Sequence, residues 1–456
     1  MRAESMRVSD RCSVSKDEAF QPWLKERGIE DVEAFMPDMA GSARGKVVTA
    51  DKFGSSTMKI PEAIFGQTIS GDYVDNKLNV EDRDMTLRPD LSRLRPVPWA
   101  TDPAASVFVD CYHSDGTPVE VSPRDVLRGV LGKYEARGWV PVVAPEVEFY
   151  LLKPHLDSNA EAEAPEDRLG WTEGARQPYS IDAMNDFDPF INDLYSYCEA
   201  QGIRIDSLSQ EMGPAQFEIN FLHGNAIELA DQVFLFKRTV REVAIEHEMH
   251  ATFLAKPMAD EAGSALHIHQ SILDKSGENI FSNEDGSASD LFYGFLGGLQ
   301  TYMPEAVLVF APYVNSYRRF LRPNTSPVNL AWAIDNRTVG LRVPDSDAEN
   351  RRIENRLAGS DVNPYLALAA TLACGYLGMV EGQKPTEVAE GSACSDKFTL
   401  HRHLYSALNA LRGSDAMRSI LGDNFIDLYC AVKEDEYREF QEIITPWERE
   451  ILMFNV

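Results

Sequence analysis

The N-terminal part of the chain, residues 1–118, carries short runs in which apolar and polar residues alternate. Runs such as Lys46–Ala50 and Ser106–Asp110 are separated by Gly, Pro and Asp, which is the pattern of short strands joined by turns. The stretch Leu87–Pro103 is rich in proline, which cannot donate a ladder hydrogen bond, so we expect neither regular strand nor helix there. The pattern predicts a small, β-rich N-terminal domain.

Residues 119–456 contain longer periodic segments, which predict a larger domain of alternating strands and helices. One helix is expected to begin at the pair Ser122–Pro123, and another at Asn363–Pro364, because Ser and Asn cap helices and Pro fits the first helical position. Periodicity predicts a further helix over Asp231–His250. The apolar stretch Leu366–Val380 is too short for a membrane span, so we expect a buried helix.

The segment Pro145–Leu152 has the composition of a strand. A period of two places Glu146 and Glu148 on one face and the apolar residues on the other. Two carboxylates on the inner face of an apolar strand repel each other, and a hard cation would offset that cost. A solvent-facing edge strand is the alternative interpretation of this pattern.

Two later segments repeat this kind of pattern. Glu211 and Glu218 flank a Gly-Pro turn and lead into a second apolar strand, while His267 and His269 share one strand face. Histidine is a common metal ligand, but two histidines at this spacing are a weak signal alone. The four residues become informative only together with Glu146 and Glu148.

Arginines gather in the C-terminal half of the chain. Alternation places Arg352, Glu354 and Arg356 on one face, and further arginines follow Asn315 and Asn336. Arginine forks bind carboxylates and phosphates through two hydrogen bonds, although a solvated charge run is the alternative. Because the chain has no GxxxxGK[ST] loop, arginines and metal ions would have to hold any nucleotide phosphate.

Composition narrows the class of protein. The 44 Lys and Arg residues and 72 Asp and Glu residues give a formal net charge of −28, which would repel nucleic acid. The six cysteines show no CxxC spacing, and the N-terminus has no apolar signal region, so we expect a cytoplasmic protein without disulfides that does not bind a membrane.

Six motifs occur in a fixed order: an ExE strand, an E-x6-E segment ending in GPxQxE, GSxxHxH, NSYxR, NRxxxxR and RxExRxxxxxxNPYL. In order and spacing these motifs resemble the glutamine synthetase family, from roughly Phe65 to Gly378. The resemblance is strongest to the γ-glutamylpolyamine synthetase branch, where it extends over nearly the full length. Sequence segments such as NRRIENRL and WEREILMFNV carry this closer resemblance.

This resemblance implies an α+β fold, with a β-grasp domain over residues 1–118 and a catalytic domain over residues 119–456 built on a curved antiparallel sheet. It also implies a homo-oligomer, a dodecamer of two stacked hexameric rings in which neighbouring subunits share each active site.

By position, the resemblance also assigns roles to residues of this sequence. Ligands of a first divalent metal, Mg²⁺ or Mn²⁺, are Glu148, Glu211 and Glu218; those of a second are Glu146, His267 and Glu354; a third ion is possible at each site. Glutamate-binding positions are Gly263, Arg319 and Arg356, with Glu148 beside them. Phosphate-binding positions are Arg337, Arg342 and Arg352, and nucleotide contacts are His269 and Ser271. Catalytic roles fall to Arg319, Arg337 and Arg356.

The chemistry implied is a two-step ligation. The γ-carboxylate of glutamate attacks the γ-phosphorus of ATP to give γ-glutamyl phosphate, and an amine then displaces phosphate to give a γ-glutamyl amide. Metal ions and arginines would neutralise the phosphate charge in both steps.

The sequence departs from true glutamine synthetases where ammonium would bind. Thr325 stands where they carry a flap glutamate, and Gly66 where a neighbouring subunit supplies an aspartate; Ala262 replaces a frequent asparagine. Loss of negative charge and bulk favours a roomier pocket for an organic amine. We therefore expect a polyamine acceptor, such as putrescine, spermidine or spermine.

Three alternatives remain open at the level of the sequence. The acceptor could be a monoamine such as methylamine, ethanolamine or isopropylamine. The chain could also be a true glutamine synthetase, or a non-catalytic sensor of glutamate or nucleotide.

Overall fold

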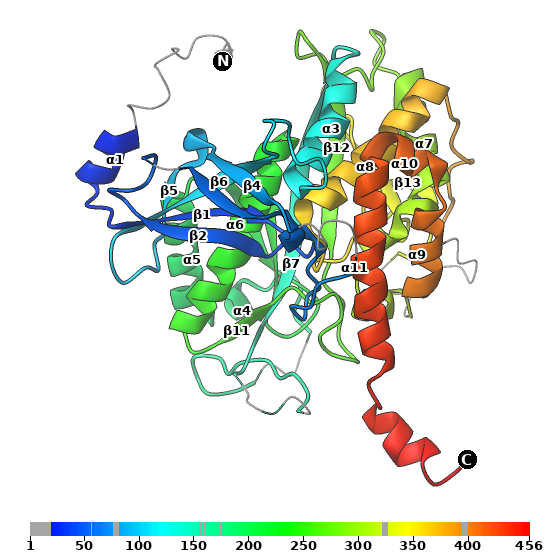
Figure 1. The fold of residues 1–456 in the computed structure, drawn as a ribbon. Coiled ribbons are helices and arrows are strands. Elements are labelled where there is room, and N and C mark those ends of the chain that lie inside the picture. The colour runs from blue at the N-terminus through cyan, green and yellow to red at the C-terminus, as the bar shows by residue number, and fades with distance from the viewer. Residues whose placement is uncertain are drawn as a thin grey trace.

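The computed structural model describes residues 20–55, 57–75, 82–154, 157, 160–172, 176–321, 327–393 and 400–456. Two sheets divide this part of the chain, one formed by strands up to Tyr112 and the other by strands from Trp139 onward (Figure 1). The predicted boundary at residue 118 falls between the last strand of the first sheet and the helix at Pro123.

The first sheet contains six strands, in the order β2-β1-β6-β4-β3 with β5 paired to β6. Their bounds are β1 Asp31–Pro37, β2 Ala43–Thr49, β3 Met58–Pro61, β4 Asp84–Pro89, β5 Arg95–Pro96 and β6 Ala104–Tyr112. β1 and β6 run parallel, whereas the other pairs are antiparallel. Helix α1 (Phe20–Glu26) and the 3₁₀ turns η1 (Glu62–Gly66) and η2 (Leu91–Arg93) complete this part. Short strands and turns thus make up most of the described residues before Tyr112.

The proline-rich stretch Leu87–Pro103 is more regular than we expected. β4 continues to Pro89, η2 follows, and β5 pairs with β6 through Arg95 and Pro96. The expectation was wrong because Pro89 and Pro96 lie at strand ends, where a missing N–H breaks no ladder.

The second sheet contains nine strands, in the order β13-β14-β15-β12-β7-β9-β8, with β10 and β11 also paired to β7. Their bounds are β7 Trp139–Leu152, β8 Ile205–Gln210, β9 Gln216–Phe221, β10 Gly224–Asn225, β11 His250–Thr252, β12 Leu266–Asp274, β13 Trp332–Ile334, β14 Leu341–Val343 and β15 Ile353–Asn355. Every pair is antiparallel except β13 with β14. The long strand β7 lies at the centre of this sheet.

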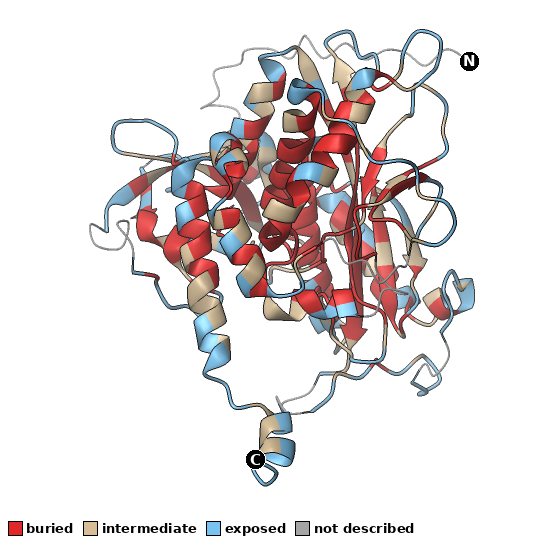
Figure 2. Ribbon diagram, turned by 90° about the vertical axis from the view of Figure 1, so that its right-hand side faces the viewer, coloured by how far each residue is buried: buried red, intermediate tan, exposed pale blue. Residues whose placement is uncertain are grey.

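Helices cover this sheet, and most buried residues lie between the two layers (Figure 2). Their bounds are α3 Pro123–Glu135, α4 Ile181–Asn185, α5 Asp188–Ala200, α6 Ala226–Glu246, α7 Asp290–Phe310, η3 Val314–Leu321, α8 Pro364–Glu381, α9 Leu404–Arg412, α10 Asp415–Leu421, α11 Asp423–Gln441 and η4 Glu448–Leu452. The segment after α11 extends away from the body of the molecule (Figures 1 and 2).

Helix α8 begins as the sequence predicts. The Asn363 side chain accepts from the backbone N–H groups of Tyr365 and Leu366, and Pro364 takes the first helical position. The helix is long and apolar enough to cross a membrane by composition, but 78% of that window is buried inside the protein. It packs against α7 and α3 as a core helix.

Helix α6 is displaced from its predicted range. It runs from Ala226 to Glu246 rather than over Asp231–His250. Its first residue lies five positions before the predicted one because Asn225 caps the helix, and at the other end His250 belongs to β11. Asn225 accepts from the N–H groups of Ile227 and Glu228, a local signal that periodicity alone does not carry.

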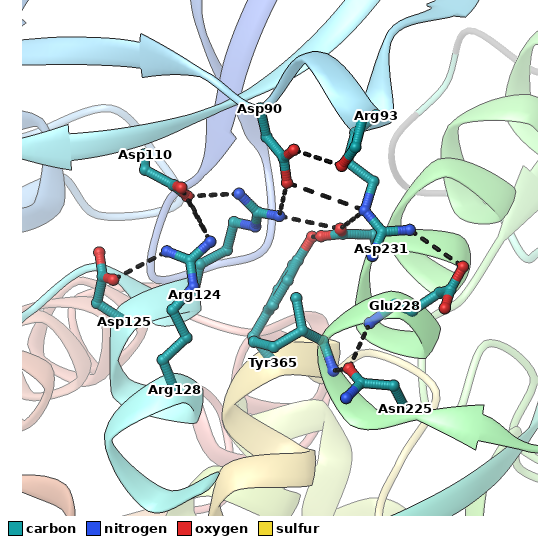
Figure 3. Close-up of polar contacts among 12 residues, drawn as sticks. Asp90, Arg93, Asp110, Arg124, Asp125, Arg128, Asn225, Glu228, Asp231 and Tyr365 are labelled. Carbon is teal, nitrogen blue, oxygen red and sulfur yellow. Dashed lines mark hydrogen bonds and ion pairs between the residues drawn. The ribbon is translucent and has the colours of Figure 1, made fainter. Parts of the chain in front are cut away.

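A buried network of charged residues joins the N-terminal sheet to the helices of the second part (Figure 3). Arg124 of α3 is 1% exposed and donates to Asp110 of β6, to Asp90 before η2, and to Asp231 of α6. Asp231 is fully buried and also accepts from Tyr365 of α8. The Arg124–Asp231 pair lies within the second part, and its contacts to Asp90 and Asp110 join that part to the N-terminal sheet.

Candidate active site

The candidate site is built on the polar face of β7. Val147, Phe149 and Leu151 are completely buried on the opposite face, so the apolar packing of the strand orients Glu146 and Glu148 toward the site. The register of the sheet then places Glu146 opposite His267 of β12, and Glu148 opposite Glu218 of β9.

Three carboxylates form one group in the site. Carboxylate oxygens of Glu148, Glu211 and Glu218 all lie within 4.8 Å of one another. Glu148 is held in place because it accepts from the Ala265 N–H at 2.8 Å. Burial, together with the charges of neighbouring glutamates, raises the pKa of Glu148 and of Glu218. A divalent cation would relieve this repulsion, and an all-oxygen donor set suits Mg²⁺ or Mn²⁺.

A second group lies beside the first. Ligand atoms of Glu146, His269 and Glu354 lie within 4.8 Å of one another, and so do those of Glu146, Glu218 and His267. His267 Nδ1 is 3.5 Å from Glu146 and 3.8 Å from Glu354. Burial and the nearby charge of Arg356 lower the pKa of His267 to about 4, so its imidazole is neutral and able to bind a metal ion at neutral pH.

Arginines surround Glu354, the innermost carboxylate of this group. Arg342 donates to Glu354 Oε2 at 2.8 Å, and Arg356 donates to the other oxygen. Although burial opposes the charged form, Arg356 and the two site histidines lower the pKa of Glu354 to about 2. Arg352 lies just before β15 and donates to His269 Nδ1 at 3.3 Å. Positive charge therefore lies directly beside the second group.

A pocket of about 340 Å³ opens on the first group. Predicted site residues in its lining are Glu148, Glu211, Glu218, Gly263, His267, Arg319, Arg337 and Arg356. Arg319 is 3% exposed and donates to the Leu357 carbonyl at 3.0 Å, which holds its guanidinium against the pocket. Gly263 packs against the stem of Arg319 so closely that a side chain would not fit.

Other residues of the pocket were not found from the sequence. Gln216 donates to the Gly263 carbonyl at 3.1 Å and so joins two walls, and its place in the GPxQxE motif was the available signal. Tyr179 and Met212 lie at the exposed rim of the pocket. Tyr179 has a φ of 63°, a strained backbone conformation that no sequence pattern predicts.

Some predicted residues lie elsewhere. Ser271 follows His269 on the same face of β12, beyond the pocket lining. Gly66 ends η1 in the N-terminal part, away from the pocket of its own chain. Thr325 lies outside the described residues.

Known proteins resemble this chain in sequence and in fold. A family model described as the glutamine synthetase catalytic domain matches residues 120–452. Gamma-glutamylputrescine synthetase PuuA of Escherichia coli (strain K12) is 36% identical, over 93% of this chain and 92% of its own. Glutamate–isopropylamine ligase of Pseudomonas sp. is 32% identical, over 93% and 95% of the two chains. A solved structure of GmaS with ADP has a TM-score of 0.81 at 29% identity, and covers 95% of this chain and 99% of that one.

The fold and site thus define an ATP-dependent ligase that joins a carboxylate to an amine. The chain belongs to the glutamine synthetase family. The predicted resemblance, the α+β fold with its curved sheet and the enzyme class are confirmed.

Proposed function

We propose that this enzyme uses ATP to ligate a polyamine to the γ-carboxylate of glutamate. The observation that carries the proposal is the site itself: two ligand groups share Glu218, beside a pocket lined by three arginines. A nucleotide phosphate, a carboxylate substrate and divalent metals all need this combination of charges.

The carboxylates and histidines of the two ligand groups fit at least two Mg²⁺ or Mn²⁺ ions. Glu148, Glu211 and Glu218 would hold one ion, and Glu146, His267 and Glu354 a second, with His269 able to join the second group. Bound there, the ions would polarise phosphate oxygens and offset their charge. The chain's own contribution is the fixed sheet register, which holds five carboxylates and the histidines at one place.

Arginines would bind the two anionic substrates. Arg319 and Arg356 line the pocket beside Gly263 and would orient glutamate, with Glu148 nearby. Arg337, Arg342 and Arg352, with His269 and Ser271, would hold the nucleotide. Position supports this role for Arg342 and Arg352, which contact the second ligand group rather than the pocket. Arg337 lines the pocket, and Arg356 lines it and also contacts Glu354.

Replacing Gly263 by Ala is expected to raise the KM for glutamate about tenfold or more, because a tenfold change costs only about 1.4 kcal/mol. The added Cβ would lie 2.5 Å from Arg319 Cγ and 2.7 Å from the Ala255 carbonyl oxygen. Both contacts are too short, so the Arg319 side chain and the backbone around Gly263 must both shift. Steady-state kinetics with varied glutamate measure the effect. The matched control is Gly129→Ala in α3, where a Cβ meets nothing within 4 Å; equal KM values for both variants would contradict this placement of glutamate.

The polyamine assignment rests on similarity and on charge. The 36% identity to gamma-glutamylputrescine synthetase exceeds the 32% identity to the isopropylamine ligase and the 29% identity to glutamine synthetase of Halobacterium salinarum. Gly66 and Thr325 remove the two carboxylates expected for ammonium, and the net charge of −28 would attract a polycation. The 32% identity also keeps a monoamine as the second candidate.

For the acceptor we predict a graded order of kcat/KM: putrescine, spermidine or spermine first, monoamines next, ammonia last. Phosphate release at fixed ATP and glutamate measures each value. If ammonia gives the highest value, the interpretation of Gly66 and Thr325 is wrong. If methylamine, ethanolamine or isopropylamine gives the highest kcat/KM, the assignment as a glutamate–amine ligase holds and the polyamine assignment is wrong.

We also propose a homo-oligomer, a dodecamer of two hexameric rings, working in the cytoplasm. The position of Gly66 away from its own pocket supports a site completed by a neighbouring subunit. Sedimentation velocity tests the size of the assembly.

A further inference from the structure

A second cavity lies apart from the catalytic pocket. This cavity of about 690 Å³ lies between α6, β11, the segment 312–318 and the C-terminal end of α11. Its walls include the rings of Phe253, Tyr313 and Phe440 and the side chains of Leu404 and Ile443. Most of this lining is apolar, yet three cations reach the cavity.

The three cations are Lys237, Arg241 and Arg318. Lys237 is 8% exposed and donates to the Val362 carbonyl at 2.9 Å and to the Ser360 carbonyl. Arg241 lies 5.0 Å over the Phe253 ring. Among the described residues, neither Arg241 nor Arg318 forms an ion pair with an acidic side chain. Lys237 is therefore buried beside the cavity, whereas Arg241 and Arg318 line it from exposed positions and have no acidic partner in the part of the chain that the structure describes.

The acidic residues of the lining already have other partners. Glu436 accepts from Lys433 Nζ at 2.7 Å and from the Ile69 N–H at 2.9 Å. Glu439 accepts from the Ser70 hydroxyl, and Asp361 accepts from the Ser316 hydroxyl at 2.6 Å. The carboxylates of the lining are thus engaged, which leaves the guanidinium groups of Arg241 and Arg318 as the available charged groups at the mouth of the cavity. An anion is the ligand that would complete them.

The cavity also shares a wall with the catalytic pocket. Arg318 lines the cavity, and the next residue, Arg319, lines the pocket. On the other side, Ser360 accepts from Lys237 through its carbonyl and donates its hydroxyl to the Glu148 carbonyl at 2.6 Å. A ligand that moves Lys237 or Arg318 would thus act on groups that position Arg319 and Glu148.

We propose that this cavity binds a small organic anion, a carboxylate or phosphate on an apolar body, and that its occupancy changes the affinity of the catalytic pocket for glutamate. The apolar body would pack on the aromatic walls, and the anionic group would take two hydrogen bonds from Arg241 or Arg318. The effect on glutamate rests on the proposed function, whereas the binding of the anion does not.

Fluorescence of 8-anilinonaphthalene-1-sulfonate, an apolar anion, tests the site on the full-length oligomer. Arg241→Met is expected to raise its Kd about tenfold, because a charge-assisted hydrogen bond contributes roughly that factor. Arg241→Lys should retain part of the affinity, and Arg27→Met, at an exposed arginine of the linker after α1, should change nothing. Phenylacetate and phenyl phosphate should displace the dye, and their relative strength distinguishes a carboxylate site from a phosphate site. Neutral phenylacetamide should not displace it.

Equal Kd values for wild type and Arg241→Met, displacement by phenylacetamide, or binding only after the subunits dissociate would each overturn the site. The last result would mean that a second copy of the chain fills the cavity. With basal turnover unchanged, Arg241→Met should lose any shift in the KM for glutamate that the displacing anion causes in wild type. No such shift in wild type would overturn the coupling alone. A protein that binds the dye through Arg241 but ligates no amine would overturn the proposed function and leave the anion site standing.

Discussion

Replacing Glu218 by Gln is expected to lower turnover about a thousandfold while making the metal-free protein more resistant to unfolding. The loss follows because Glu218 belongs to both ligand groups, and metal ions supply about 4 kcal/mol or more of charge stabilisation in such reactions. Glutamine keeps the size of the side chain but binds a divalent cation weakly. One substitution therefore separates function from stability.

The gain in stability has an electrostatic origin. Burial and the charges of Glu146 and Glu211 raise the pKa of Glu218 above its usual 4.5, so its ionised form costs folding free energy. This cost is small below pH 4.5 and grows as the pH rises toward the folded-state pKa, so the advantage of Gln should appear at neutral pH and disappear in acid. Each unit of pKa shift corresponds to about 1.4 kcal/mol.

Thermal unfolding with excess chelator and phosphate release with Mg²⁺ or Mn²⁺ measure the two effects. The matched control is Glu199→Gln, at an exposed position of α5, which should change neither. Wild-type protein in chelator should be inactive and should recover when either ion is added. Full turnover in excess chelator would contradict the metal assignment.

Replacing Asp231 by Asn is expected to destabilise the protein by about 3–5 kcal/mol, because it leaves Arg124 buried with less compensating charge. Asp231 accepts from Arg124 at 3.0 Å and from Tyr365, and lies 3.4 Å from Arg93. The thermal midpoint at fixed protein concentration measures the loss. Protease cleavage between residues 113 and 122 should also increase as the N-terminal part loosens.

Two further variants make this result specific. Asp427→Asn breaks an ion pair whose carboxylate is 65% exposed, and should cost less than about 1 kcal/mol. The double variant Arg124→Met with Asp231→Leu should recover part of the stability, since apolar residues of similar volume replace buried ion pairs well. If Asp231→Asn costs no more than Asp427→Asn, the network does not hold the two parts together.

The candidate site shows how far local patterns reach. Alternation predicted that Glu146 and Glu148 share a face of a strand, and the buried Val147 and Phe149 on the other face confirm it. The same pattern could not indicate that His269 of β12 and Glu354 of β15 would meet Glu146, because partners in a sheet are set by register between distant segments. Tyr179 was missed for a similar reason, since its rim position depends on a strained turn.

The sequence by itself determined the class of fold, the cap of α8, the buried nature of that helix and the family, because these depend on residue types at short, fixed spacings. Only the tertiary structure decided where α6 begins, how Arg124 and Asp231 join the two parts, and that Arg241 faces a second cavity. These features arise where segments far apart in the chain pack together. Their free energy depends on burial and on partners, which a local pattern does not contain.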